Sequence, residues 1–202
     1  MKIAIEGMDG VGKSTIAKKI ADSNSMKYIE KPLIELFNTK TIDGKTNLEN
    51  ICENIYNQQS ELIKAWFFGL GNIYTFLKYN DEDLIIDRQF ASNYLWNGTD
   101  KSIPIFNCML ELIGVPDLTI ILFASVETRM KRLYNRNPND FDLTDEEKKV
   151  LGYDKMIEFL EKFNIPYVVV NTENKNIDDV CNEVQNIIDL EKKKQIQKRL
   201  GK

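Results

Sequence analysis

Short runs of apolar residues recur along the chain, separated by longer stretches in which apolar residues return every three or four positions. Uninterrupted apolar runs of this length are typical of strands buried on both faces of a parallel sheet. Five strands are expected, and the one at 27–30 has the weakest pattern. The runs are IAI at 3–5, KYIE at 27–30, LIID at 84–87, LTIILF at 118–123 and YVVV at 167–170.

The longer stretches have the spacing of helices with one buried face. They cover residues 14–23, 48–79, 103–113, 126–135, 144–163 and 177–200. Parallel neighbouring strands require a crossover that covers one face of the sheet. The alternation therefore predicts an α/β sandwich of three layers, with a five-stranded parallel sheet between helices. A chain of 202 residues is long enough for one such domain, and no linker or internal repeat divides it.

Three polar segments interrupt this alternation. Residues 38–47 (NTKTIDGKTN) are expected to form a mobile loop before the long helix. Residues 135–144 (NRNPNDFDLT) are too long for an ordinary connection of about 4–6 residues, so we expect a short lid at about 133–146. The basic tail at 191–202 (EKKKQIQKRLGK) is expected to be the frayed, solvated end of a helix.

Composition excludes several kinds of chemistry. The net charge of −4 argues against a surface that binds nucleic acid or anionic lipid through positive potential. The chain has no histidine, which excludes imidazole bases, Ser-His-Asp triads and histidine metal sites. Its cysteines, at 52, 108 and 181, form no CxxC pair, and no apolar segment approaches the roughly 18 residues of a membrane span. We expect a cytoplasmic protein without signal peptide or anchor.

Residues 7–15 carry a phosphate-binding motif. The sequence GMDGVGKST satisfies GxxxxGK[ST], follows a predicted strand directly and runs into a predicted helix. Glycines let successive amides turn inward at a helix N-terminus, where the partial positive charge favours phosphate. Lys13 adds a cation for the β- and γ-phosphates, and the Ser14 hydroxyl is the expected Mg²⁺ ligand. The residues expected to hold the ATP phosphates are Gly7, Asp9, Gly10, Val11, Gly12, Lys13, Ser14 and Thr15.

An Asp-Arg pair after a later strand narrows the class. A regulatory GTPase needs a DxxG switch and an NKxD motif, and the nearest sequence, NKNID at 174–178, has its aspartate one place late. A motor ATPase generally needs a larger domain. Asp87, at the end of a predicted strand, is expected to hold a water of the Mg²⁺ shell, and Arg88 has the planar fork that suits an acceptor phosphate. The pair favours a kinase of small molecules with the P-loop NTPase fold.

These motifs resemble those of the thymidylate kinases. EGMDGVGKST at 6–15 resembles that family's phosphate loop, whose aspartate, here Asp9, contacts the 3′-hydroxyl of the acceptor sugar. DRQFASNYLWNG at 87–98 is similar to the family's DR[YF]xxSxxAYQG element, and PDLT at 116–119 to its strand of that sequence. ETRMKRLYNR at 127–136 has the ExxxxRxxxR spacing of the lid hinge, and residues 171–180 resemble the segment near the adenine. The matches span nearly the whole chain in the family's order.

The departures from the family fall on the acceptor side. In the family an FxAxxR-like element stacks its aromatic ring on thymine and holds the acceptor monophosphate with its arginine. Here Phe68 supplies the aromatic ring, and Asn72 stands in the place of the arginine. The family's Tyr-Gln is replaced by Trp96 and Asn97, whose amide is still able to pair with a base edge, and its REP turn by EKP at 30–32.

The resemblance implies transfer of a phosphoryl group from ATP, with Mg²⁺, to a deoxynucleoside monophosphate, above all dTMP to give dTDP. The phosphate loop has glycine at position 10 and therefore no arginine of its own, so arginines at the lid would have to compensate. The expected catalytic residues are Lys13, Arg88, Arg132 and Arg136, and the expected metal residues are Ser14 and Asp87. The acceptor is expected at Asp9, Glu30, Phe68, Asn72, Arg88, Trp96 and Asn97.

Two other functions stay open. A nucleoside hydroxyl needs a carboxylate base, and Glu30, at the end of a predicted strand, resembles the base of deoxynucleoside kinases. A monophosphate oxygen is already an anion at pH 7, and Lys31 offers it a charge in place of the missing arginine. A nucleotide sensor without catalysis is supported by Asn72 alone. Because thymidylate kinases generally pair through helices that flank the sheet, the apolar segment at 51–76 is expected to form a homodimer interface.

Overall fold

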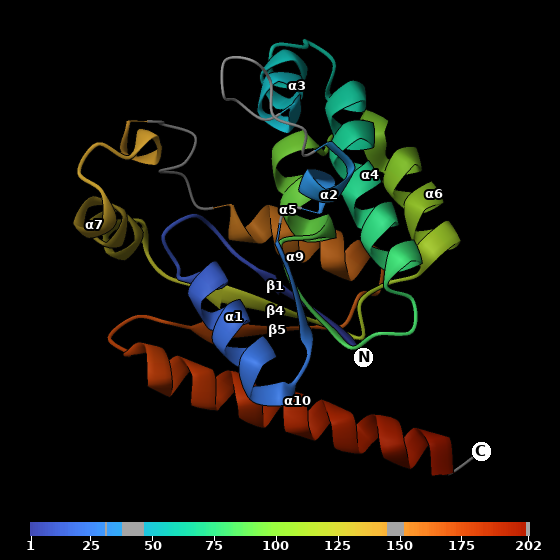
Figure 1. Cartoon of the computed structure of the whole chain (residues 1–202), viewed down its shortest axis with the longest axis vertical. Coiled ribbons are helices and arrows are strands. Elements are labelled where there is room, and N and C mark those ends of the chain that lie inside the picture. Colours follow the sequence, from blue (N-terminus) through green and yellow to red (C-terminus); the bar gives the residue numbers. More distant parts are fainter. Residues whose placement is uncertain (31, 38–46, 145–151, 201–202) are drawn as a thin grey trace.

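The protein, described from a computed structural model that covers residues 1–30, 32–37, 47–144 and 152–200, is built on a parallel sheet (Figure 1). Its five strands lie in the order β2-β3-β1-β4-β5. They are β1 (Lys2–Glu6), β2 (Lys27–Glu30), β3 (Leu84–Asp87), β4 (Leu118–Phe123) and β5 (Tyr167–Asn171). All five predicted strands are confirmed. The three central ones are almost wholly buried, because helices cover both of their faces.

Helices lie on both faces of the sheet, so the predicted three layers are confirmed (Figure 1). One face carries α1 (Lys13–Asn24) and α10 (Ile177–Leu200), which pack against each other. The other face carries α4 (Glu61–Lys78), α5 (Phe90–Asn97), α6 (Ile103–Ile113) and α9 (Tyr153–Lys162). The remaining elements are α2 (Leu33–Phe37), α3 (Asn47–Tyr56), η1 (Asp100–Ser102), α7 (Val126–Arg136) and η2 (Phe141–Leu143).

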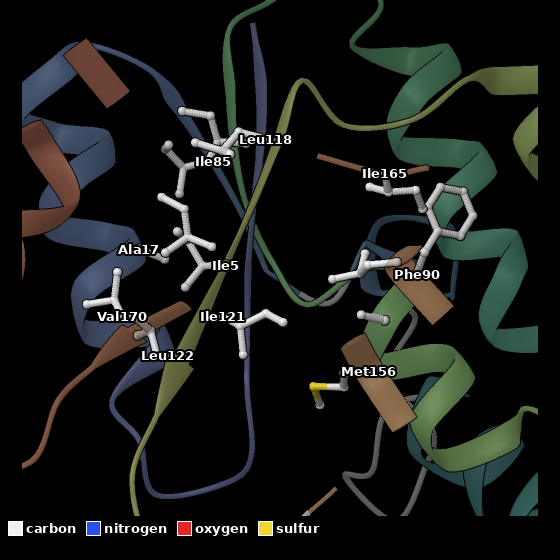
Figure 2. Packing of buried hydrophobic residues seen from close by; sticks show 14 of the residues in the cluster. Ile5, Ala17, Ile85, Phe90, Leu118, Ile121, Leu122, Met156, Ile165 and Val170 are labelled. Carbon is white, nitrogen blue, oxygen red and sulfur yellow. The ribbon is translucent and has the colours of Figure 1, made fainter. Parts of the chain in front are cut away.

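The hydrophobic core fills the space on each side of the sheet, since alternate strand residues point to opposite faces. Ala17 of α1 lies on the same side as Ile5 and Ile85, whereas Phe90 and Met156 lie on the opposite side (Figure 2). Burial on both sides leaves no solvated face for a polar residue in the central strands. Polar groups are therefore concentrated at the ends of the strands, where the loops converge.

The single helix predicted at 48–79 is wrong, because two helices occupy this segment. α3 ends at Tyr56, and α4 begins at Glu61 with Ser60 as its N-cap. The intervening residues 57–60 (NQQS) include Asn and Ser, whose side chains compete with the backbone for hydrogen bonds and favour helix ends. Because of this break, α3 lies at a different angle from α4 (Figure 1). Tyr56 at the end of α3 can therefore pack against Phe68 of α4.

Several segments and residues for which the sequence made a prediction lie outside the described residues. These are the loop at 38–46, Lys31, residues 145–146 of the lid, and the first part of the helix predicted at 144–163, whose described portion is α9. In the described part of the lid, α7 ends at Arg136 and the short turn η2 follows. α10 is helical as far as Leu200, so most of the basic tail continues the helix. Within the described ranges, no helix has the length and apolar character needed to cross a membrane.

Candidate active site

The phosphate-binding motif forms the loop between β1 and α1. Gly7, Gly10 and Gly12 have φ angles of 134°, 86° and 95°, a left-handed region that residues with a Cβ rarely adopt. A Cβ on Gly7 would also lie 2.4 Å from the carbonyl oxygen of Leu122, because the loop passes close to β4. The left-handed turns bring the loop to the N-terminus of α1, where backbone amides without helical partners favour an anion.

Lys13 begins α1 and is buried beneath this loop. Its Nζ donates to the carbonyl oxygen of Met8 at 2.8 Å and lies 3.6 Å from Oδ1 of Asp9. Burial, reinforced by the charge of Arg88, lowers the pKa of Lys13 to about 7, although Asp9 acts in the opposite direction. A phosphate bound in the loop would supply the counter-charge that this amine needs to be fully protonated.

Asp87 ends β3, which packs against α1, the helix whose first turn carries Ser14. Asp87 is buried. Its Oδ2 accepts a hydrogen bond from the Tyr28 hydroxyl at 3.2 Å, whereas its Oδ1 has no hydrogen-bond partner among the described residues. A buried carboxylate oxygen without a donor suits a hydrated cation, because it otherwise loses its own hydration without compensation. With the exposed Ser14 hydroxyl, it fits the expected Mg²⁺.

Arg88 follows β3 in a left-handed conformation, with φ of 70°. Its backbone N–H donates to the carbonyl oxygen of Ile5 at 3.0 Å, which ties it to the strand that enters the phosphate loop. The guanidinium forms an ion pair with the Asp9 carboxylate of that loop. Arg88 is therefore brought next to the phosphate loop, as its predicted role in holding an acceptor requires.

Glu6, which was not predicted as a site residue, holds the backbone between Arg88 and α5. The side chain is fully buried, and its Oε1 accepts from the backbone N–H groups of Gln89 and Ser92 at 2.8 and 3.2 Å. Its Oε2 accepts from the Ser92 hydroxyl. Burial raises the pKa of Glu6, and the hydrogen bonds oppose this shift. Glu6 thus supplies acceptors for the first turn of α5 and fixes the backbone that follows Arg88. The only signal in the sequence was a charged residue that ended an apolar run.

Four of the predicted acceptor residues come from α4 and α5, which pack against each other. Phe68 on α4 is half-buried, and its ring centroid lies 5.3 Å from that of Tyr56 on α3. Asn72 is buried, with no hydrogen-bond partner for its amide nitrogen among the described residues. On α5, Trp96 is half-buried, and the buried Asn97 donates to the side-chain oxygen of Asn93 at 3.0 Å.

Tyr56 is a second residue that sequence analysis missed. It ends α3, leaves 60% of its surface exposed, and packs its ring against Phe68 at an interplanar angle of 37°. Burial of its hydroxyl raises its pKa, and the charges of Arg88 and Asp9 act on it in opposite directions. Tyr56 therefore lies beside the aromatic ring that is expected to stack on a base. It stood in the stretch predicted as one long helix, where no pattern distinguished it.

Glu30 ends β2 and is exposed. In the sheet it is the register partner of Asp87, so the two side chains point to the same face on neighbouring strands. Glu30 also lines a surface hollow of about 410 Å³ together with Ser14 and Tyr28. The structure thus brings the candidate base close to the residues expected to hold the metal.

A larger cavity of about 640 Å³ opens on the other side of the phosphate loop. Val11, Gly12 and Thr15 of the loop and helix line it, together with residues of α7 and of the turn between β5 and α10. Both predicted lid arginines are part of its wall. Arg132 donates to the hydroxyl and the carbonyl oxygen of Thr172 at 2.9 and 2.7 Å, while the exposed Arg136 forms an ion pair with Asp140.

Arg129 shares the helical spacing of those arginines but differs in its environment. It is fully buried, and its Nη1 donates to the carbonyl oxygen of Asp9 at 3.2 Å. A Cβ on Gly10 would lie 2.7 Å from the carbonyl oxygen of Arg129, so the backbones of α7 and the phosphate loop are in close contact. Spacing placed Arg129 on the right helix, but only the structure distinguishes it as a support of the loop.

A parallel sheet with strand order β2-β3-β1-β4-β5, a phosphate loop after β1 and an Asp-Arg pair after β3 define a P-loop kinase of small molecules. A model of the thymidylate kinase family matches residues 5–184. The chain therefore belongs to the thymidylate kinase family, and it is a nucleotide kinase.

Individual relatives agree with this assignment. The chain is 27% identical over 199 residues to a probable thymidylate kinase from Methanococcus maripaludis, and the match covers 92% of this chain and 94% of the relative. It is 28% identical over 223 residues to a thymidylate kinase from Mycoplasma capricolum, with 98% and 99% covered. A solved structure of deoxyadenosine kinase from M. mycoides, with the products dCMP and a flexible dCDP bound, has a TM-score of 0.64 at 19% identity and covers 94% of this chain and 99% of its own. At that identity the likeness shows the fold.

Proposed function

We propose that this enzyme transfers the γ-phosphate of ATP, with Mg²⁺, to a deoxynucleoside monophosphate, and specifically that it converts dTMP to dTDP. The observation that carries the proposal is the ion pair between Arg88 and Asp9 beside the phosphate loop. A planar guanidinium there is suited to hold an acceptor phosphate opposite the γ-phosphate. The family and its thymidylate kinase relatives support dTMP as the acceptor.

Transfer to a monophosphate asks for little covalent work from the protein. The second pKa of a phosphate monoester is about 6, so the attacking oxygen is already an anion at pH 7 and needs no base. This oxygen forms a bond to the γ-phosphorus while the bond from that phosphorus to the bridging oxygen breaks, and ADP leaves. Lys13 on the donor side and Arg88 on the acceptor side reduce the repulsion between the two phosphates as they approach.

Ser14 and Asp87 are the residues that would hold Mg²⁺, Ser14 through its hydroxyl and Asp87 through the carboxylate oxygen to which no described residue donates. When bound, the ion neutralises charge on the phosphate oxygens of ATP. Arg132 and Arg136 line the cavity beside the phosphate loop, which supports a role for them at the donor nucleotide. Asp9 is proposed to contact the acceptor sugar, Phe68, Trp96 and Asn97 its base, and Asn72 to take the place of the family's arginine on the acceptor side.

A hydroxyl acceptor is the second candidate, because Glu30 lies next to Asp87 across the β2–β3 pair and lines the hollow that Ser14 also lines. A carboxylate at this position could take the proton of a nucleoside 5′-hydroxyl as the hydroxyl oxygen bonds to the γ-phosphorus. The asparagine at position 72, where the family has an arginine, also weakens the case for a monophosphate.

The two candidates are separated by assaying the purified protein with ATP, Mg²⁺ and a panel of deoxynucleosides and their monophosphates. We expect dTMP to be the best acceptor and Glu30→Gln to leave its transfer within about twofold. If Glu30 is the base, the fastest acceptor will be a nucleoside, and Glu30→Gln will lower its rate by about 10²–10⁴. Asp22→Asn is the matched control, since Asp22 lines the same hollow and is exposed. Failure of every acceptor would favour a nucleotide sensor.

We also propose that the enzyme acts in the cytoplasm as a homodimer that pairs through α4. This helix exposes large apolar side chains, most of which are separated by three, four or seven positions, a pattern expected of a helix with a partner on that face. They are Leu62, Ile63, Trp66, Leu70 and Leu77. Sedimentation of the wild type should give twice the mass of one chain, and Leu70→Lys should give one chain. A monomeric wild type at micromolar concentration would reject the interface.

A further inference from the structure

Tyr28 lies between the two residues that would hold the metal. In the β2–β3 pair Tyr28 is the register partner of Ile85, and Ile85 points to the same face as Asp87, two positions further along β3. This is the face covered by α1 (Figure 2). The Tyr28 hydroxyl donates to Oδ2 of Asp87 at 3.2 Å, and Tyr28 lines the same surface hollow as Ser14.

The hydrogen bond to Asp87 has a consequence for the other carboxylate oxygen. The terminal torsion of an aspartate is broad, so a carboxylate without partners can rotate between many orientations. A donor on Oδ2 restricts this rotation and leaves Oδ1, which has no partner among the described residues, as the acceptor available to a ligand. A tyrosine hydroxyl is protonated at neutral pH, so it acts as a donor to the carboxylate.

We propose that Tyr28 is a positioning residue of the metal site, which orients Asp87 for the hydrated Mg²⁺ by donating to the carboxylate oxygen that the ion does not use. The proposal rests on the function proposed above, in which Asp87 and Ser14 hold the ion. Ligating carboxylates are commonly fixed by hydrogen bonds from a second residue, and removal of such a partner typically costs about 10–100-fold in metal affinity or activity.

A purely structural role for Tyr28 makes a different prediction. The ring packs against the hydrophobic core next to α1, and Tyr28→Phe keeps this packing while it removes only the hydroxyl. If the ring alone mattered, Tyr28→Phe would behave as the wild type. Tyr167→Phe is the matched control, because the Tyr167 hydroxyl also donates to a carboxylate, that of Glu161 at 2.9 Å, but on the exposed surface.

The test is the affinity for ADP, measured by calorimetry with Mg²⁺ and again with EDTA in place of the metal. In the wild type and in Tyr167→Phe, we expect Mg²⁺ to tighten ADP binding by the same factor. In Tyr28→Phe, that factor should fall about tenfold or more, while affinity in EDTA and the melting temperature stay close to the wild type. Tyr28→Phe added to Asp87→Asn should cause no further loss, because the hydroxyl acts through the carboxylate.

Equal gains from Mg²⁺ in the wild type and in Tyr28→Phe would overturn the proposal, and so would a wild type whose ADP affinity does not respond to Mg²⁺. The assay contains no acceptor, so its result is independent of whether dTMP is the substrate. A protein that fails to phosphorylate dTMP but shows the expected loss in Tyr28→Phe would reject the acceptor and retain the role of Tyr28.

Discussion

The charge state of Lys13 should make nucleotide binding depend on pH. In the protein without nucleotide, burial is the main cause that lowers the pKa of this amine to about 7. Bound phosphates supply the missing counter-charge, so the pKa should return toward its ordinary value of about 10.4. The nucleotide therefore prefers the protonated amine, and above pH 7 binding has to be accompanied by the uptake of a proton.

The size of the effect follows from these two pKa values. Between pH 7 and pH 9 the dissociation constant for MgADP should rise about fiftyfold, which corresponds to about 2.3 kcal/mol. At pH 8 binding should take up about 0.9 proton for each ADP. The phosphates contribute little over this range, because the last pKa of a phosphate monoester is about 6. Affinity should thus fall steadily as the pH rises.

Calorimetry at pH 7, 8 and 9, in buffers of different ionisation enthalpy, measures both the affinity and the proton uptake. Lys13→Met has no titrating group here, so it should bind ADP weakly at pH 7 and lose both the pH dependence and the proton uptake. A wild-type dissociation constant that changes less than about threefold from pH 7 to pH 9, with no proton taken up at pH 8, would mean that Lys13 is already charged in the free protein. That result would refute the reasoning.

Three further predictions concern residues around the site. Arg129→Met removes the side-chain donor to a buried carbonyl of the phosphate loop, so the free energy of unfolding in urea should fall by about 1–3 kcal/mol. A denaturation midpoint equal to that of the wild type would contradict this prediction. Tyr56→Ala should raise the acceptor KM about tenfold, whereas Tyr56→Phe keeps the ring on Phe68 and should raise it no more than about twofold. The affinity for ADP should be unchanged in both variants. An unchanged KM in Tyr56→Ala would remove the residue from the acceptor site. Gly98→Ala would bring a Cβ 2.3 Å from the carbonyl oxygen of Tyr94, so the end of α5 has to shift. We expect thermal and urea denaturation to show a free energy of unfolding that is about 1–3 kcal/mol lower. Stability equal to that of the wild type would exclude the clash.

The strands and the phosphate loop were predictable because their signals are local. A strand covered on both faces has to be apolar throughout, and β1, β3 and β4 lie in the centre of the sheet. In the phosphate loop, the glycines with left-handed φ, the lysine and the serine follow one another along the chain. Helix α5 was missed because eight residues show too little periodicity, and its first turn is held by Glu6, 83 residues earlier in the sequence.

The acceptor side was predictable only in part. Phe68 was identified from a motif, but Tyr56, whose ring packs against it, belongs to a different helix that the apolar pattern had joined to α4. Helical spacing relates Arg129, Arg132 and Arg136 along α7. It could not show that Arg129 is buried under the phosphate loop while Arg136 is exposed, because periodicity describes one helix and not what packs against it.

The five strands, the phosphate loop and the class of kinase were predictable from the sequence alone, since each depends on residues that are neighbours or one helical turn apart. The hydrogen bonds of Glu6 to the first turn of α5 and of Tyr28 to Asp87 depend instead on how the strands are arranged in space. Both contacts form because β3 lies between β2 and β1 in the sheet. Both stabilise the site because the groups are buried, where the loss of a hydrogen bond is costly. Neither condition is visible in a local pattern of apolar and polar residues.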